Sequence, residues 1–154
     1  MQVFIVGSPL ETAKAMERDI KRYNKQIIEV RQILDALNGA KAWSNHPCTL
    51  QYKEYEEWLC DYHNCLSNYR EYLKFGNTEE NYLGYAEFYS ISAEYNKPPF
   101  HTEEYFEQMK RRLYTKDPIF YAQWMNLGTS EVNWYYVDGE WRYYKNGKRV
   151  KESV

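Results

Sequence analysis

One stretch of the chain constrains the fold more than any other. Between residues 49 and 75, large apolar side chains recur at alternating spacings of three and four: Tyr52, Tyr55, Leu59, Tyr62, Leu66, Tyr69 and Leu73. An α-helix turns once in about 3.6 residues, so this spacing places all of them on one stripe of a helix. The pattern predicts a long helix over about 49–75 that ends at Gly76.

A second stripe of the same kind precedes the first. Its members are Ile20, Tyr23, Ile27, Val30, Leu34 and Leu37. The helical region begins at a capping box, Ser8-Pro9-Leu10-Glu11, and ends at Asn38-Gly39, with Arg18-Asp19 allowing a break. Two long helices joined by a short connection are expected to pack antiparallel.

The remaining segments are shorter. Residues 2–6 read as a short strand or extended segment, and further helical segments are expected over about 78–95, 102–114 and 117–125. Near the end, Asp138-Gly139 lies between two aromatic runs, which predicts a hairpin with a type I′ turn, and Asn146-Gly147 offers a second turn.

These patterns predict a mainly α protein: a compact helical domain with two long antiparallel helices and an aromatic-rich C-terminal tail or small hairpin. The chain has 154 residues, so we expect a single domain, 1–154, with a helical body, 1–125, and an aromatic and basic tail, 126–154. Aromatic residues make up 18% of the chain, which excludes a disordered class. No apolar run approaches the ~18 residues of a membrane helix, so no membrane partner is expected.

The charge of the chain bears on which partners it can bind, and its cysteine content bears on the compartment in which it works. The net charge is −2, which is not the overall signature of a nucleic-acid binder. The basic residues nevertheless cluster near 21–31, 110–116 and 142–151, and these clusters would form one basic face if they met in space; otherwise they are solvated surface charges. Three cysteines are too few for a disulfide scaffold, which indicates a reducing compartment such as the cytoplasm.

No metal or other cofactor is expected. Cys60, His63 and Cys65 lie close in sequence, but they lack a CxxC pair and a fourth ligand.

One candidate site lies on the first long helix. Arg22, Lys25 and Glu29 are spaced three and four apart and lie off the apolar stripe, so they share another face. A carboxylate flanked by cations stays ionised, and it can stabilise a developing cation or move a proton. The alternative is an ordinary surface ion pair between Lys25 and Glu29.

Two other groups are candidates for ligand binding. His46 directly precedes a predicted helix, where it can touch an anion, or it simply packs against Trp43.

The tail alternates aromatic and basic side chains, a pattern in which the aromatic rings stack on bases while the cations hold phosphates. The tail candidates are Trp141, Arg142, Tyr143 and Lys145. The alternative for them is a packing hairpin with a solvated edge.

Several short motifs together resemble one known family. They are Arg22…Lys25-Gln26-Ile27…Glu29, Gln32-Ile33-Leu34, Leu37-Asn38-Gly39, Asn45-His46-Pro47, Tyr55-Glu56…Leu59…Tyr62 and Lys116-Asp117-Pro118…Tyr121. In this order they resemble the pyrimidine-dimer DNA glycosylase (endonuclease V-like) family of phages and some bacteria. The resemblance covers roughly residues 1–125, and the basic, aromatic tail is similar in kind to the family's DNA-contacting C-terminus.

The resemblance implies a mechanism. In this family the N-terminal α-amine attacks C1′ of the damaged nucleotide, an imine forms, the base leaves, and β-elimination nicks the strand. Glu29 occupies the place of the family's helix-borne glutamate, and Arg22 falls where the family has a basic or imidazole residue. Gln2 is bulky, so Met1 is expected to be retained and to supply the amine. Lys110 and Arg111, which precede the Lys-Asp-Pro motif, are expected on the substrate side.

Two functions stay open from the sequence. The first is a DNA-repair glycosylase/AP lyase that acts on damaged pyrimidines in DNA without a cofactor. The alternative is a non-catalytic, phage-type protein that uses the same cleft to bind a nucleotide or a host factor. A third reading, a helical interaction module in which the tyrosine stripe forms an oligomer, is compatible with the same residues.

Overall fold

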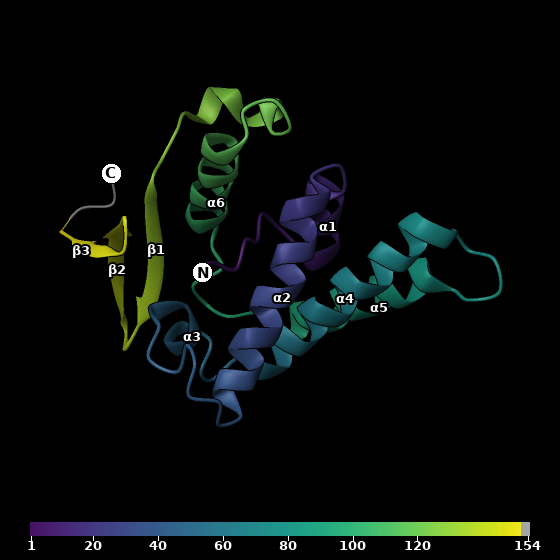
Figure 1. Cartoon of the computed structure of the whole chain (residues 1–154), viewed down its shortest axis with the longest axis horizontal. Helices are drawn as coiled ribbons and strands as arrows, with labels where there is room; N and C mark the ends of the chain where they lie inside the picture. The colour runs from purple at the N-terminus through teal and green to yellow at the C-terminus, as the bar shows by residue number, and fades with distance from the viewer. Residues whose placement is uncertain (152–154) are drawn as a thin grey trace.

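The computed structural model describes residues 1–151 and is mainly α, as predicted, with a small sheet at its C-terminal end (Figure 1). The helices are α1 (Pro9–Met16), α2 (Ile20–Leu37), α3 (Pro47–Gln51), α4 (Glu56–Phe75), α5 (Tyr82–Tyr95), α6 (Glu103–Lys116) and the 3-10 helix η1 (Ala122–Leu127). The strands are β1 (Val132–Val137), β2 (Glu140–Lys145) and β3 (Lys148–Val150), antiparallel in that order. Within residues 1–151, no helix is both long enough and apolar enough to cross a membrane.

The two long helices α2 and α4 pack antiparallel, which confirms the arrangement predicted from the two apolar stripes. Side-chain contacts run along the pair with residue numbers rising on α2 as they fall on α4: Asn24–Arg70, Arg31–His63 and Asn38–Glu56. Between them, the Tyr23 hydroxyl donates a hydrogen bond of 2.7 Å to the Leu66 carbonyl. The middle of each predicted stripe is buried, including Ile27, Val30 and Leu59, whereas the end members Ile20 and Leu73 are exposed.

Helix boundaries follow the capping residues. The capping box forms between Ser8 and Glu11, and the helical region breaks before Asp19, whose carboxylate caps α2. The predicted helix over 49–75 is divided, because α3 ends in a turn at Tyr52 and α4 begins only at Glu56. Similarly, α5 begins later than predicted because Asn81 supplies its cap. The helix expected over 117–125 is the short 3-10 turn η1 instead.

The N-terminal segment is extended but is not a member of any sheet. Its backbone groups bond to helix side chains instead. The Gln26 carboxamide accepts from the Phe4 N–H at 2.6 Å and donates to the Gln2 carbonyl at 3.0 Å. Farther along, Thr12 accepts from the Val6 N–H at 3.0 Å. Residues 2–6 are all buried, and side chains from the helices supply the hydrogen bonds that a neighbouring strand would otherwise provide.

The C-terminal hairpin forms as predicted. Asp138 and Gly139 have φ values of 53° and 78°, the left-handed pair that a type I′ turn requires. Asn146 and Gly147 repeat the geometry, with φ values of 51° and 77°, and lead into β3. The sheet lies against α6, where the Gln108 side chain donates to the Val132 carbonyl at 2.7 Å. The predicted division into body and tail at residue 126 stays a prediction.

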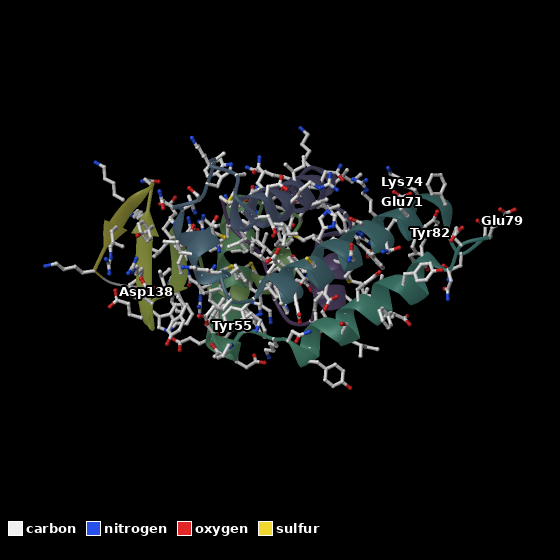
Figure 2. All side chains as sticks on the ribbon, turned by 90° about the horizontal axis from the view of Figure 1, so that it is seen from below. Tyr55, Glu71, Lys74, Glu79, Tyr82 and Asp138 are labelled. Carbon is white, nitrogen blue, oxygen red and sulfur yellow. The ribbon has the colours of Figure 1, made fainter. Side chains whose placement is uncertain are left out.

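The arrangement places the beginning of the chain at the centre of the molecule. Figure 1 shows the N-terminus between α2 on one side and α6 with the sheet on the other. In Figure 2 the sheet, marked by Asp138, lies at one end of the protein, and the connection between α4 and α5, marked by Glu79, lies at the other.

The first prediction concerns Gln26. Replacing Gln26 by Leu leaves the Phe4 N–H and the Gln2 carbonyl buried without partners, at a cost of ~1–3 kcal/mol for each group. We expect Gln26→Leu to lower the free energy of unfolding in urea by about 2–4 kcal/mol. The control is Gln32→Leu, a half-buried position on the same helix. Equal losses in both variants would contradict the bridging role.

Candidate functional site

The carboxylate of Glu29 meets the beginning of the chain. Its Oε2 accepts a hydrogen bond of 2.9 Å from the backbone N–H of Gln2, which is one residue from the terminal amine. Its Oε1 lies 3.8 Å from Nζ of Lys25, one helical turn earlier. The Glu29 side chain is only 12% exposed, whereas that of Lys25 is 62% exposed. Glu29 is therefore a half-enclosed acid beside the N-terminus rather than a partner in a surface ion pair alone.

Met1 is held from the opposite side by the sheet. The Tyr135 hydroxyl, from β1, donates a hydrogen bond of 2.9 Å to the Met1 carbonyl. Tyr135 itself is buried, with 2% of its surface exposed. The first peptide unit is thus fixed between α2, through Glu29, and β1, through Tyr135. This clamping limits the positions that the terminal amine can adopt.

His46 lies against the same group from α3. Its Nδ1 accepts from the Cys48 N–H at 3.1 Å, and its ring meets Tyr135 edge-on with centroids 5.8 Å apart. Burial lowers the pKa of His46, and the positive charge of the N-terminal amine lowers it further, against a smaller opposing effect of Glu29. A neutral His46 adds no positive charge beside the amine. Its edge contact with Trp43, at 5.7 Å, shows that it also packs as the alternative reading expected.

Two cations reach the site from α6. Burial lowers the pKa of Lys116, and the charges of Arg112, Arg22 and Lys25 lower it further, while Glu29 opposes them. Burial also lowers the pKa of Arg112, whose guanidinium donates to the Asn133 side chain at 2.9 Å and the Ser130 carbonyl at 3.0 Å. Lys116 is therefore close enough to Arg112, Arg22 and Lys25 for their charges to act on it, and close enough to Glu29 to be partly compensated.

Arg22 completes this basic group. Its guanidinium lies over the Phe4 ring, 5.6 Å from the centroid. Its Nε is buried and has no hydrogen-bond partner among the described residues. A guanidinium with an unused donor beside other cations can bind an anion such as a phosphate.

The structure brings together part of the predicted set of site residues. The members that meet are Met1, Arg22, Lys25, Glu29 and His46. Lys110 instead has its amine over the Trp124 ring, 6.0 Å from the centroid. Arg111 donates to the Leu127 carbonyl at 2.9 Å and pairs with Glu107 at 3.6 Å.

The positions on α6 that reach the group are Arg112 and Lys116, which are four apart and so share one face. The Lys116-Asp117-Pro118 motif in the sequence already indicated Lys116. Arg112 could be identified only by knowing which face of α6 is turned inward.

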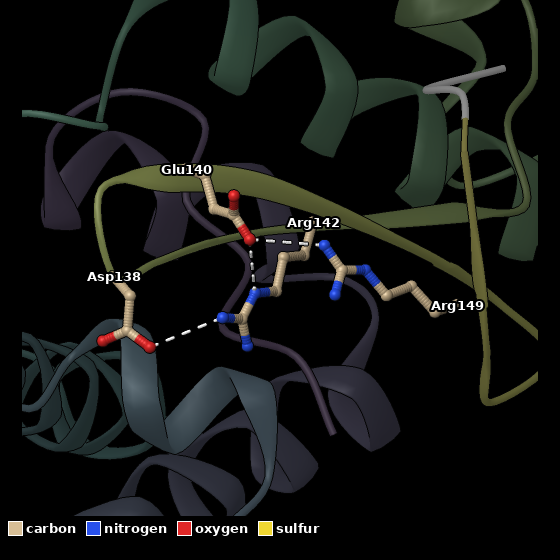
Figure 3. Close-up of polar contacts among 4 residues, drawn as sticks. All are labelled: Asp138, Glu140, Arg142 and Arg149. Atoms are coloured by element: carbon tan, nitrogen blue, oxygen red, sulfur yellow. Dashed lines mark hydrogen bonds and ion pairs between the residues drawn. The ribbon is translucent and has the colours of Figure 1, made fainter.

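The predicted tail residues are mostly engaged within the protein. Trp141 packs on Tyr105, and Tyr143 meets Trp134 edge-on. Figure 3 shows Arg142 between Asp138, at 3.4 Å, and Glu140, at 3.3 Å, with Glu140 also bonded to Arg149. Lys145 lies 4.0 Å from Glu131. Nearby acids thus offset part of the basic charge that the sequence shows in the tail.

The site therefore consists of the first peptide unit, the Glu29 carboxylate and nearby cations. Residues 1–75 match the model of the pyrimidine dimer DNA glycosylase family. The match supports the resemblance over residues 1–75, which include Met1, Arg22, Lys25, Glu29 and His46, whereas the Lys116-Asp117-Pro118 motif lies beyond it. No curated protein and no solved structure matches the chain.

The second prediction concerns the crowded cations. Lys116→Met should raise Tm by roughly 1–2 °C, because it removes a half-buried charge that burial and three neighbouring cations disfavour. The lowered pKa of Lys116 in the folded state means that wild-type stability rises with pH, so the gain should shrink as the pH approaches ~10.4, the ordinary value for lysine.

Circular dichroism melts at several pH values test this prediction. The control is Lys148→Met on β3, where the residue is exposed. A lower Tm for Lys116→Met at neutral pH would show that the charge stabilises the fold instead.

Proposed function

We propose that this protein is a DNA-repair glycosylase and AP lyase that acts on damaged pyrimidines through its N-terminal amine. The observation that carries the proposal is the hydrogen bond from the Gln2 N–H to Glu29, which sets an acid beside the first residue of the chain. The family match over residues 1–75 supports the same class of substrate, DNA that contains pyrimidine dimers.

The cations supply the binding step. Arg22, Lys25 and Arg112 lie close enough to Lys116 to lower its pKa, and Lys25 pairs with Glu29, even though the whole chain carries a net charge of −2. A local positive group of this kind attracts the phosphates that flank a lesion and releases their counterions. Burial and these cations lower the pKa of Lys116. Lys116 therefore gains most from a phosphate, because a nearby negative charge favours its protonated form.

The chemistry then needs an amine and an acid. The neutral amine of Met1 attacks C1′, and the C1′–N1 bond breaks with its electron pair on the base, which leaves after taking up a proton. The new ammonium loses a proton, the C1′–O4′ bond opens, and O4′ takes up a proton to leave an imine on C1′. Glu29, as a carboxylate, stabilises the positive charge that develops on the sugar and receives the proton from nitrogen.

Strand cleavage follows from the imine. Loss of a proton from C2′ forms the C2′–C3′ double bond and breaks the C3′–O3′ bond, so the 3′ phosphate departs. Water then hydrolyses the imine and frees the amine of Met1. His46, the N-cap residue of α3, adds no further positive charge beside this amine, because burial lowers its pKa.

The third prediction tests the chemistry directly. Borohydride should trap a covalent complex between the protein and DNA that contains a thymine dimer or an abasic site, because it reduces an imine to a stable amine. Mass spectrometry of the adduct should locate the bond on the N-terminal residue. Blocking the amine by N-terminal acetylation should abolish trapping, and an adduct that persists after acetylation would exclude the terminal amine as nucleophile.

The fourth prediction concerns Glu29. Glu29→Gln keeps an oxygen that can accept from the Gln2 N–H but removes the negative charge, so the fold should persist. We expect base release to fall by about a hundredfold or more, the usual range for losing an acid–base group, while DNA affinity changes little.

The matched control is Glu79→Gln at the far end of the molecule (Figure 2). Unchanged base release by Glu29→Gln would remove the acid from the mechanism. Nucleotide binding by a protein that neither nicks nor traps DNA would favour the non-catalytic alternative.

A further inference from the structure

The side chain of Gln2 has polar atoms that nothing in the described structure satisfies. Gln2 is 5% exposed, and neither Oε1 nor Nε2 of its carboxamide has a hydrogen-bond partner. Its backbone, in contrast, is fully bonded, to Glu29 through the N–H and to Gln26 through the carbonyl. Buried amides without partners are rare and costly, so this one requires an explanation.

The place of this carboxamide in the chain suggests the explanation. Gln2 directly follows the residue whose amine is the proposed nucleophile, and its N–H is bonded to the proposed catalytic acid. Arg22, from the same group, also has a buried donor without a partner. Buried donors without partners on both the N-terminal segment and α2 are explained if a ligand supplies the missing acceptors.

We infer that the carboxamide of Gln2 binds the pyrimidine that is removed, with its N–H donating to the carbonyl oxygen O2 of the base. This inference rests on the proposed function and names a further residue that contacts the substrate. O2 is bonded to the ring carbon next to N1, so it is the polar atom of the base closest to C1′. We therefore assign O2, rather than a more distant polar atom of the base, to the residue adjacent to the nucleophile.

The same contact assists the reaction. When the C1′–N1 bond breaks, the electron pair spreads from N1 onto O2. A hydrogen bond to O2 is therefore stronger in the transition state than in the bound substrate, which lowers the barrier to base release. At an abasic site the base is already absent, so the same carboxamide has no role in imine formation or β-elimination.

This difference makes the inference testable with one variant on two substrates. Gln2→Met keeps the length of the side chain and a bulky second residue, but it removes both polar atoms. Single-turnover rates are measured on a duplex with a thymine dimer and on the same duplex with an abasic site. We expect the ratio of dimer to abasic cleavage to fall about tenfold or more.

A stability measurement separates binding from folding. Because the carboxamide has no partner within the described protein, Gln2→Met should unfold at the same temperature as the wild type or at a higher one. The matched control is Thr49→Val, which removes another buried and unpartnered polar atom, Oγ1. It should leave the ratio of the two rates unchanged.

The outcomes separate this inference from the proposed function. Equal losses on both substrates would show that Gln2 only positions the N-terminus, and unchanged rates would show that its carboxamide touches no base; either result overturns the inference. A wild-type protein that cleaves neither substrate overturns the proposed function, and the inference falls with it. Mass spectrometry must find Met1 retained in both proteins, so that the nucleophile is the same.

Discussion

The structure depends on the burial of an extended N-terminal segment without a neighbouring strand. Buried backbone groups must find partners, and here α2 supplies them through Gln26 and Glu29. The chain's first residues are therefore held in register with one face of α2. The interaction that satisfies the backbone is also the one that brings an acid to the N-terminus, so folding and the assembly of the candidate site are a single event.

The cost of this site is concentrated charge. Arg22, Lys25, Arg112 and Lys116 repel one another, and burial and this repulsion together lower the pKa of Lys116. Glu29 compensates only one charge among several. Such an arrangement is less stable than a neutral one would be, and it becomes favourable when a polyanion binds. The acidic residues elsewhere in the chain bring the net charge to −2 although these cations lie close together.

Periodic and turn patterns in the sequence predicted the structure better than single charged residues did. The stripes of α2 and α4 gave two helices and their antiparallel packing, and Asp138-Gly139 gave the hairpin turn, because each of these depends on local spacing. The spacing could not show which cations of α6 lie near Glu29: Lys110 and Arg111 contact Trp124 and Leu127, whereas Lys116 is influenced by Glu29. A role of Lys110 and Arg111 in substrate binding stays a prediction. Which face of α6 turns inward is decided by contacts with β1 that are distant in sequence.

The site combines residues from the segment that matches the family model with residues that lie beyond that segment. The segment that matches the family model supplies Met1, Arg22 and Glu29, but it ends at residue 75. Tyr135, which clamps Met1, and Lys116 come from beyond it. Because the clamp fixes a carbonyl and not a side chain, it does not depend on the identity of the first residue. A sheet of different sequence can therefore hold the same carbonyl, provided that a donor stays where the Tyr135 hydroxyl lies.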